Sequence, residues 1–342
     1  MWVYLLLLIV VFILLILSVI YIVKLSHRFL KKDFTNNYIT WILSFVLILL
    51  FILGLFIDTV NAIVVDIHLI ILTALTKLIF FIIKKITKKG FSEYFILSLG
   101  IIITLLVMIP AYYQAYDVKQ TEYLVYSTKD ISTDKFRIVQ ISDSHIGTTF
   151  NGKEFGKYIK DINKLNPDIV VITGDFVDDN TSYEDMVDAS SSLGKLKTKY
   201  GIYFIYGNHD KGYFSNRSYN DKDIEKELNK NNVIILEDTL IELTDNIVLI
   251  GRQDNSNLYR ADIIGLTRNI DKSKYIITLD HQPNDYDNEI KSETDFVLSG
   301  HTHGGHIFPI GQFGVILGAN DKIYGMEKRD NTTFIVNSGI SG

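Results

Sequence analysis

Aspartate, asparagine and histidine recur where five short hydrophobic runs end, all in the second half of this sequence. The five clusters are Asp143-Ser144-His145, Gly174-Asp175, Gly207-Asn208-His209-Asp210, Asp280-His281 and Gly300-His301-Thr302-His303. The chain has no cysteine, so disulfides and thiolate metal sites are excluded. Carboxylate oxygen, amide oxygen and neutral imidazole nitrogen are the remaining ligands for a divalent transition metal. The clusters therefore predict a metal site.

The mixture of residue types suits two metal ions rather than one. Two divalent ions about 3.5–4 Å apart repel each other, so a shared anionic ligand should lie between them. A carboxylate can bridge because each of its two oxygens carries lone pairs. Glycine precedes Asp175, Asn208 and His301, which predicts sharp turns and close backbone approach there. Each cluster alone could be a turn or a surface pair, but five in succession favour one site.

The elements that must position these clusters alternate between strand-like and helical patterns. Strands are expected at residues 136–142, 168–173, 201–206, 246–251, 274–279 and 295–299, and helices at 153–165, 183–196 and 221–230. This alternation predicts a layered α/β fold. In open α/β sheets, ligands bind outside the carboxyl ends of the strands. We therefore expect the five clusters to meet at one edge.

Taken together, these motifs resemble the signature of the calcineurin-like metallophosphoesterases over roughly residues 135–339. The resemblance implies an αββα sandwich with two metal ions. It implies one ion held by Asp143, His145, Asp175 and His303, and a second held by Asp175, Asn208, His281 and His301, with Asp175 bridging. It also implies that His209 lies over the substrate phosphate, where it stabilises charge or protonates the leaving oxygen, and that Asp210 orients His209.

The function implied is metal-dependent hydrolysis of a phosphodiester or phosphomonoester, with a metal-bridging hydroxide that attacks phosphorus in line. The expected cofactors are two divalent ions, manganese first, with Fe, Zn or Co as alternatives. No Gly-x-Ser-x-Gly nucleophile motif occurs in the chain. The alternative is a non-catalytic membrane receptor with a metal-binding metallophosphoesterase-like domain. All seven ligands and His209 are present, which favours the enzyme.

Two features depart from the family pattern. His306 stands where many membrane-anchored members carry Gln, and we expect it to neighbour the ligands or contact substrate. The sequence also stops at residues 337–342, where the family usually continues into another loop and strand. A C-terminal truncation is therefore an expectation, although it would remove no metal ligand.

The first third of the chain predicts a membrane region. Apolar runs cover residues 2–23, 39–57, 60–83 and 94–109, and about 20 apolar residues span a bilayer. We expect about four transmembrane helices in residues 1–117, followed by a metallophosphoesterase domain at 118–342. This arrangement resembles a bacterial membrane-anchored subgroup of the family. A cleaved signal peptide is the alternative for the first run, but no positive region precedes that run.

The basic residues predict the topology. Residues 24–32 and 84–89 hold eight Lys and Arg, whereas residues 58–59 and 110–117 hold none. The positive-inside rule therefore places the catalytic domain on the extracellular side of a multi-pass membrane protein. The third run also contains Asp66, His68 and Lys77. Asp66 and Lys77 are expected to reach the two membrane surfaces, whereas the pattern gives no role for His68.

The charge balance limits the partners. Residues 1–117 carry a net charge of +4 and residues 118–342 a net charge of −9. An acidic domain argues against nucleic acid, because binding to a phosphate backbone needs clustered Lys and Arg. The expected partners are the lipid bilayer and a phosphoester substrate, such as a lipid headgroup or an envelope component.

Overall fold

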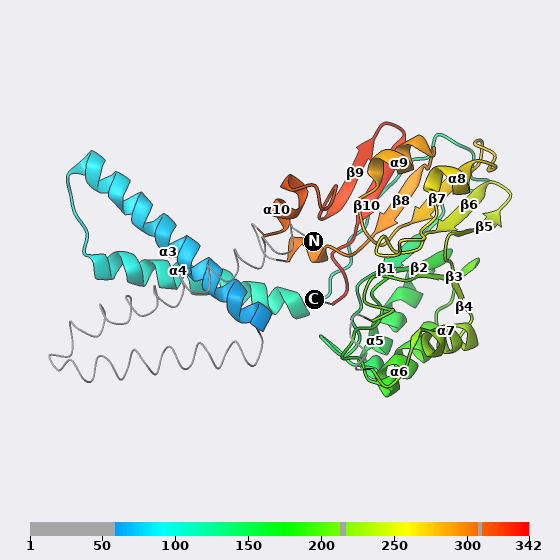
Figure 1. Cartoon of the computed structure of the whole chain (residues 1–342), viewed down its shortest axis with the longest axis horizontal. Helices are drawn as coiled ribbons and strands as arrows, with labels where there is room; N and C mark the ends of the chain where they lie inside the picture. Colours follow the sequence, from blue (N-terminus) through cyan, green and yellow to red (C-terminus); the bar gives the residue numbers. More distant parts are fainter. Residues whose placement is uncertain (1–58, 213–216, 307–309, 342) are drawn as a thin grey trace. The chain divides into compact units, whose positions relative to one another are not determined.

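The computed structural model describes residues 59–212, 217–306 and 310–341 (Figure 1). The chain divides into two compact units, Met1–Tyr113 and Gln114–Gly342. The expected transmembrane runs at residues 2–23 and 39–57 lie outside the described residues. They stay predictions, as does the domain boundary at residue 117.

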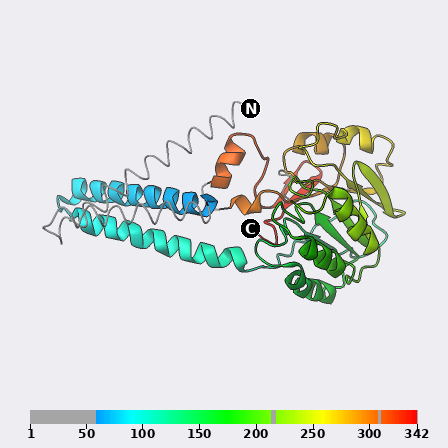
Figure 2. The same ribbon diagram turned by 60° about the horizontal axis from the view of Figure 1, so that its bottom comes forward.

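Two long apolar helices make up the described part of the first unit and its connection to the second. They are α3 (Thr59–Thr87) and α4 (Glu93–Tyr116), and they run in opposite directions (Figure 2). Within them, Val64–Thr87 and Phe95–Tyr116 are long and apolar enough to cross a membrane. The helices touch where Gly100 lies so close to Thr73 that an added methyl group would overlap it.

Two expectations for this region are corrected. The fourth apolar run was expected to end at residue 109, but α4 continues through Pro110 to Tyr116. Proline removes one backbone N–H, a loss that apolar membrane helices tolerate, and the extended helix is no longer short for a span. Asp66 was expected to reach the membrane surface, but Asp66 and His68 are each only 4% exposed. The Nδ1 of His68 lies 2.8 Å from the Val64 carbonyl oxygen.

The second unit contains two β-sheets. The first has the order β1-β2-β3-β4, with all strands parallel: β1 (Ile138–Ile141), β2 (Ile169–Thr173), β3 (Gly201–Ile205) and β4 (Val233–Ile235). The second has the order β5-β6-β7-β8-β10-β9: β5 (Thr239–Thr244), β6 (Ile247–Gly251), β7 (Tyr275–Leu279), β8 (Phe296–Ser299), β9 (Gly325–Arg329) and β10 (Thr332–Val336). Only its two edge strands are antiparallel to their neighbours.

Helices cover the outer face of each sheet, as Figure 1 shows. The first sheet carries α5 (Gly152–Lys164), α6 (Tyr183–Leu193) and α7 (Asp221–Lys230), and the second carries α8 (Ile263–Thr267) and α9 (Tyr286–Lys291). Phe155 and Met186 pack with Val170 of β2 on one outer face, and the Tyr286 ring stacks on Phe334 of β10 on the other, with centroids 3.7 Å apart.

A second set of side chains fills the space between the two sheets. Val171 and Ile205 of the first sheet pack in one buried cluster with Leu249 and Ile277 of the second. The alternation of side chains along each strand sends one set inward and the next set toward the helices. The unit is therefore the four-layer αββα sandwich expected from the sequence.

Local sequence explains where the helices begin. Asn151 accepts a hydrogen bond from the Glu154 N–H, and the Glu154 side chain accepts one from the Asn151 N–H. Asn220 and Asp223 form the same capping box at the start of α7. This arrangement satisfies two backbone donors that a helix start otherwise leaves without partners. The described residues of this unit also include three short α-helices that periodicity did not predict, α8, α9 and α10 (Ile310–Ile316).

Candidate metal centre

The five polar clusters lie at the carboxyl ends of strands, as expected. Asp143 and His145 follow β1, Asp175 follows β2, Asn208 and His209 follow β3, His281 follows β7, and His301 and His303 follow β8. Parallel pairing within each sheet, and the packing of the two sheets, bring these ends to one edge.

The backbone at this edge is unusual. Asp143, His145, Asp175, His301 and His303 all have positive φ, between 36° and 73°. Residues with a side chain seldom adopt this left-handed conformation, and such strain gathers where a function requires a particular geometry. Each of these residues turns its side chain sharply out of a strand end and toward its neighbours.

Glycines allow the strand ends to approach each other. A methyl group on Gly174 would overlap the Nδ1 of His281, and one on Gly300 would overlap the Asp143 carboxylate. A methyl group on Gly207 would overlap the carboxylate of Asp175. The close approach expected at these three glycines is therefore confirmed.

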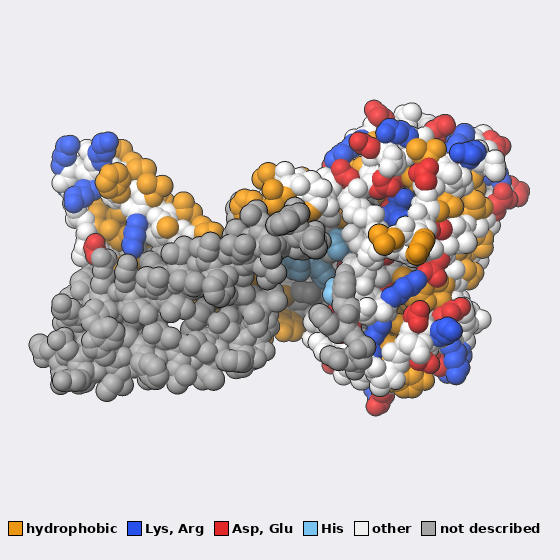
Figure 3. Space-filling view, viewed as in Figure 1, with side chains coloured by type: hydrophobic (Ala, Val, Ile, Leu, Met, Phe, Trp, Pro, Cys, Tyr) orange, Lys and Arg blue, Asp and Glu red, His pale blue; other side chains and the backbone are white. Residues whose placement is uncertain are grey.

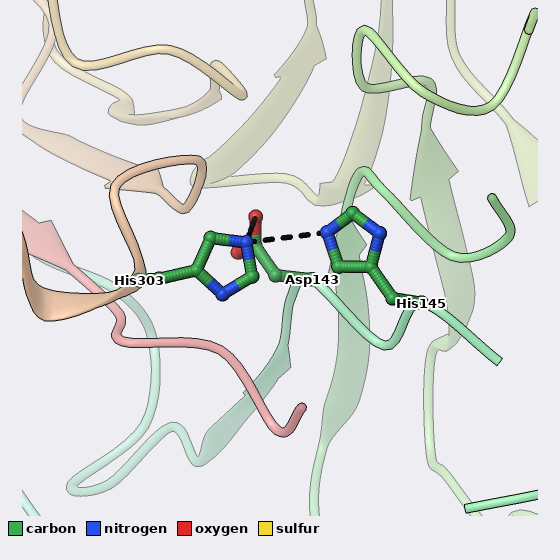
Figure 4. A group of neighbouring side chains, drawn as sticks. All are labelled: Asp143, His145 and His303. Atoms are coloured by element: carbon green, nitrogen blue, oxygen red, sulfur yellow. Dashed lines mark hydrogen bonds and ion pairs between the residues drawn. The ribbon is translucent and has the colours of Figure 1, made fainter. Parts of the chain in front are cut away.

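The first group of candidate ligands is Asp143, His145 and His303, whose nearest ligand atoms all lie within 4.8 Å of one another (Figure 4). The Nε2 atoms of the two histidines are 3.2 Å apart. His303 Nδ1 lies 3.0 Å from the Ser341 carbonyl oxygen, and His145 Nδ1 lies 3.1 Å from an Asp178 oxygen. Both outer partners can only accept, so both Nδ1 atoms carry the proton. In the neutral rings, two lone pairs then face each other, an arrangement that a cation between them would stabilise.

The second group is Asp175, His281 and His301, also within 4.8 Å, with Asn208 beside it. His281 Nδ1 lies 2.8 Å from the Thr173 carbonyl oxygen, so it donates there. In the neutral ring its Nε2 then carries a lone pair, and this atom lies 3.0 Å from Asn208 Oδ1 and 3.2 Å from Asp175 Oδ2. When the His281 ring is neutral, its Nε2 atom, Asn208 Oδ1 and Asp175 Oδ2 are three acceptors that face one another with no proton between them. This donor set fits a divalent ion bound by nitrogen and oxygen.

Asp175 lies between the two groups. Its Oδ2 is 3.2 Å from His281 Nε2 in one group and 3.7 Å from His145 Nε2 in the other. Its Oδ1 accepts a hydrogen bond from the His209 N–H at 2.8 Å, which fixes the carboxylate orientation. This is the position that a bridging ligand requires. The structure thus brings all seven predicted ligands into two adjoining groups, and their binding of metal stays a prediction.

His209 is oriented by Asp178, a residue that the sequence motifs did not indicate. We expected Asp210 to hold the His209 ring, but Asp210 is fully buried and accepts four backbone hydrogen bonds, two of them from the N–H groups of Asp175 and Gly207. Its carboxylate shapes the turn rather than contacting His209 Nδ1. That atom lies 3.1 Å from Oδ1 of Asp178. The Oδ2 of Asp178 contacts His145, so one carboxylate orients two rings.

Burial and the neighbouring charged groups shift the pKa values of the side chains in this site. Burial opposes charge on His281, but Asp175 and Asp143 outweigh burial and raise its pKa well above the ordinary value. Burial and the neighbouring His281 lower the pKa of His301 to about 4. The hydrogen bonds from His145 and His209 hold the pKa of Asp178 well below its usual range. The site therefore attracts positive charge, and protons would compete with metal ions for the same nitrogens.

A cavity of about 330 Å³ opens above the two groups. Asp175, His209, His301 and His303 line one part of it, and His306 lines another. The rings of His306 and His303 stack with centroids 5.0 Å apart. His306 therefore neighbours a candidate ligand, as expected, and lines the cavity, while its contact with substrate stays a prediction.

The comparisons with known proteins agree with this geometry. Residues 136–305 match the family model described as calcineurin-like phosphoesterase. An uncharacterized metallophosphoesterase of Bacillus subtilis is 28% identical over 67% of this chain and 80% of its own length. One from Helicobacter pylori is 32% identical over 61% of this chain and 55% of its own. A Bos taurus transmembrane protein with a metallophosphoesterase domain is 30% identical over 60% of this chain and 48% of its own.

The matched part of this chain thus spans about half the length of the last two relatives. Residues 136–305, which match the family model, include every candidate ligand and His209. Through this domain, the chain belongs to the calcineurin-like metallophosphoesterase family.

Proposed function

We propose that this protein hydrolyses phosphoesters with two divalent metal ions held at the shared edge of its two sheets. The proposal rests on the two groups of candidate ligands, whose acceptor atoms face one another and which Asp175 joins. Asp143, His145, Asp175 and His303 would hold one ion, and Asp175, Asn208, His281 and His301 the other. When bound, the ions supply an activated water and neutralise the charge that develops on phosphorus oxygens.

The protein's own residues would position the substrate and protonate the leaving oxygen. His209 lines the cavity, and Asp178 holds its Nδ1–H, so the ring is oriented at the place where a phosphate oxygen or a leaving oxygen would lie. The carboxylate of Asp178 also stabilises the imidazolium form and thereby raises the pKa of His209 against the effect of burial. A protonated His209 can stabilise negative charge or donate its proton to the departing oxygen.

Nitrogen and oxygen ligands without thiolate suit manganese, iron, zinc or cobalt, and we propose manganese as the first metal to test. We further propose that the protein is an integral membrane protein with its catalytic domain outside the cell. Two apolar helices among the described residues and a transmembrane relative support the membrane location. The distribution of basic residues supports the side.

The test uses the full chain in detergent with bis(p-nitrophenyl) phosphate and p-nitrophenyl phosphate. Chelation should abolish turnover of at least one substrate, and Mn²⁺ should restore it. Asn208→Ala should lower kcat/KM at least about 100-fold, the scale of losing one charge-stabilising group. Asn229→Ala, an exposed asparagine on α7, is the matched control and should change nothing. Metal binding without turnover of either substrate would favour the non-catalytic receptor instead.

A further inference from the structure

Helix α10 and the residue after it expose bulky apolar side chains. Phe313 is 56% exposed, Ile316 75% and Leu317 70%. Residues 310–320 include no charged side chain. Hydrophobic side chains gather over α10 in Figure 3. Exposed apolar side chains that gather on a domain surface mark a site of contact with a protein, a membrane or a ligand.

The other face of α10 forms part of the candidate active site. Gly311 and Gly314 line the cavity that also contains His301 and His303. Gly311 lies against the backbone of Gly305, where an added methyl group would overlap. The helix thus turns its small residues toward the site and its bulky residues outward. Whatever contacts the bulky face lies at the rim of the cavity.

The segment that follows α4 contacts a residue next to the cavity lining. Helix α4 ends at Tyr116, and the Thr121 hydroxyl lies 3.3 Å from the Tyr324 hydroxyl. Ile323, the residue before Tyr324, lines the cavity. Five residues of extended chain reach at most about 18 Å. Only five residues of chain therefore connect the end of α4 to a residue beside this rim.

A second apolar protrusion lies near the same edge. Leu258 and Tyr259 are 95% and 90% exposed on the loop between β6 and α8. The Asp238 carboxylate accepts hydrogen bonds from both ends of the loop, at 2.9 Å from the Gln253 nitrogen and 2.7 Å from the Ala261 nitrogen. Arg260 contacts Asp280, the residue before the candidate ligand His281. The loop is thus held in place while it presents two apolar side chains to solvent.

Building on the proposed function, we propose that α10 docks on the lipid bilayer and that the site cleaves the phosphoester headgroups of lipids in that bilayer. The uncharged outer face of α10 suits the boundary between headgroups and acyl chains. The short tether holds that face near the membrane of the same chain, so no second protein is required. A lipid phosphate could then enter the cavity while its acyl chains stay in the bilayer.

The first test measures docking with a single cysteine in this cysteine-free chain. Leu317→Cys, labelled with a fluorophore, is reconstituted in phosphatidylcholine–phosphatidylglycerol vesicles with brominated acyl chains. The fluorescence should fall at least twofold relative to unbrominated vesicles. Leu240→Cys is the matched control, because Leu240 is 45% exposed on β5, at the opposite edge of the second sheet. Its fluorescence should not change. Equal quenching at both positions, or cross-linking of Leu317→Cys between two copies, would overturn the docking assignment.

The second test measures substrate class with two p-nitrophenyl phosphodiesters that share a leaving group, one bearing a methyl and the other a dodecyl chain. In vesicles, kcat/KM for the dodecyl ester should exceed that for the methyl ester at least about tenfold. Ile316→Asn/Leu317→Asn should remove this preference and leave methyl-ester turnover unchanged. Leu240→Asn should preserve both rates.

The two proposals can fail separately. Turnover of the methyl ester without a dodecyl preference would overturn the lipid substrate and leave phosphoester hydrolysis standing. Failure to hydrolyse either ester would overturn the lipid substrate, and failure to hydrolyse p-nitrophenyl phosphate as well would overturn the proposed function, while quenching would still decide docking.

Discussion

Asp178 offers the most informative single substitution, because its two oxygens each hold a different histidine. Oδ2 contacts Nδ1 of His145 and Oδ1 contacts Nδ1 of His209, both at 3.1 Å. Asp178→Asn keeps one acceptor and replaces the other with an NH₂ group, which cannot accept from a ring N–H. A bound metal at His145 would fix that ring's tautomer, so the remaining oxygen should stay with His145. His209 should then lose its partner.

The expected losses follow from these contacts. An outer partner of a metal-binding histidine is worth about 10–100-fold in metal affinity, so the affinity at the Asp143–His145–His303 group should fall by up to that factor. At saturating metal, kcat should fall about 10²–10⁴-fold, the range for one positioned acid–base group. Metal affinity is measured by competition with a chromogenic chelator, and kcat with p-nitrophenyl esters.

The double variant Asp178→Asn/His209→Ala tests whether Asp178 affects turnover through His209. If Asp178 acts on turnover through His209, the double variant should be no slower than His209→Ala alone at saturating metal. If the two substitutions instead lowered kcat by the product of their separate factors, Asp178 would not act through His209. Asp188→Asn, an aspartate on α6 with Lys153 as its partner, is the matched control and should leave kcat and metal affinity unchanged.

Further outcomes follow from the same structure. His209→Ala should keep both metals and lose about 10²–10⁴-fold in kcat, with a smaller loss for acidic leaving groups; loss of metal would make His209 a ligand instead. Burial, and then Asp280, raises the pKa of Glu289 well above its ordinary value, so Glu289 takes up a proton on folding and stability falls as pH rises above the unfolded pKa. Glu289→Gln should therefore raise Tm at pH 8 by roughly 2–4 °C and by less at pH 5, and a lower Tm at pH 8 would contradict this. In intact cells, Lys157→Cys should react with a membrane-impermeant thiol reagent and Lys88→Cys should not; the reverse pattern would place the catalytic domain inside.

The strand ends could be predicted because local sequence carries both signals they need. A β-branched run followed by Gly-Asp or Gly-Asn-His marks a buried strand and the sharp turn that ends it. All six expected strands are present, and α7 has the expected bounds, residues 221–230. Four strands among the described residues were not predicted. The sequences of β5 and β9 are exposed and partly charged, and β4 has only three residues, whereas the fully buried run of β10 was a signal available in the sequence.

The roles of Asp178 and Asp210 could not be read from spacing alone. Asp210 follows His209 directly, which suggested a partner, but its burial and four backbone donors show that it stabilises the turn. Asp178 lies only three residues after Asp175, and that spacing was a signal available in the sequence. Which of its neighbours it contacts depends on the packing of β1, β2 and β3 ends, and that is a tertiary property.

The same limit applies to α10 and α4. Helix α10 contains three glycines within and just after it, at 311, 314 and 318, which lowers helix propensity. Its site-facing glycines make sense only once the cavity is known. The fourth apolar run was taken to end at residue 109, directly before Pro110, but α4 continues through this proline in an apolar segment.

The central claim is that two metal ions share Asp175, and a stoichiometric titration tests it most directly. Metal-free full-length protein in detergent is titrated with Mn²⁺ while bound metal and hydrolysis of bis(p-nitrophenyl) phosphate are followed together. Both should rise until two equivalents per chain are bound, and Asp175→Asn should bind at most one equivalent and lose nearly all activity. Full activity at one equivalent, or two tightly bound ions in Asp175→Asn, would contradict the account.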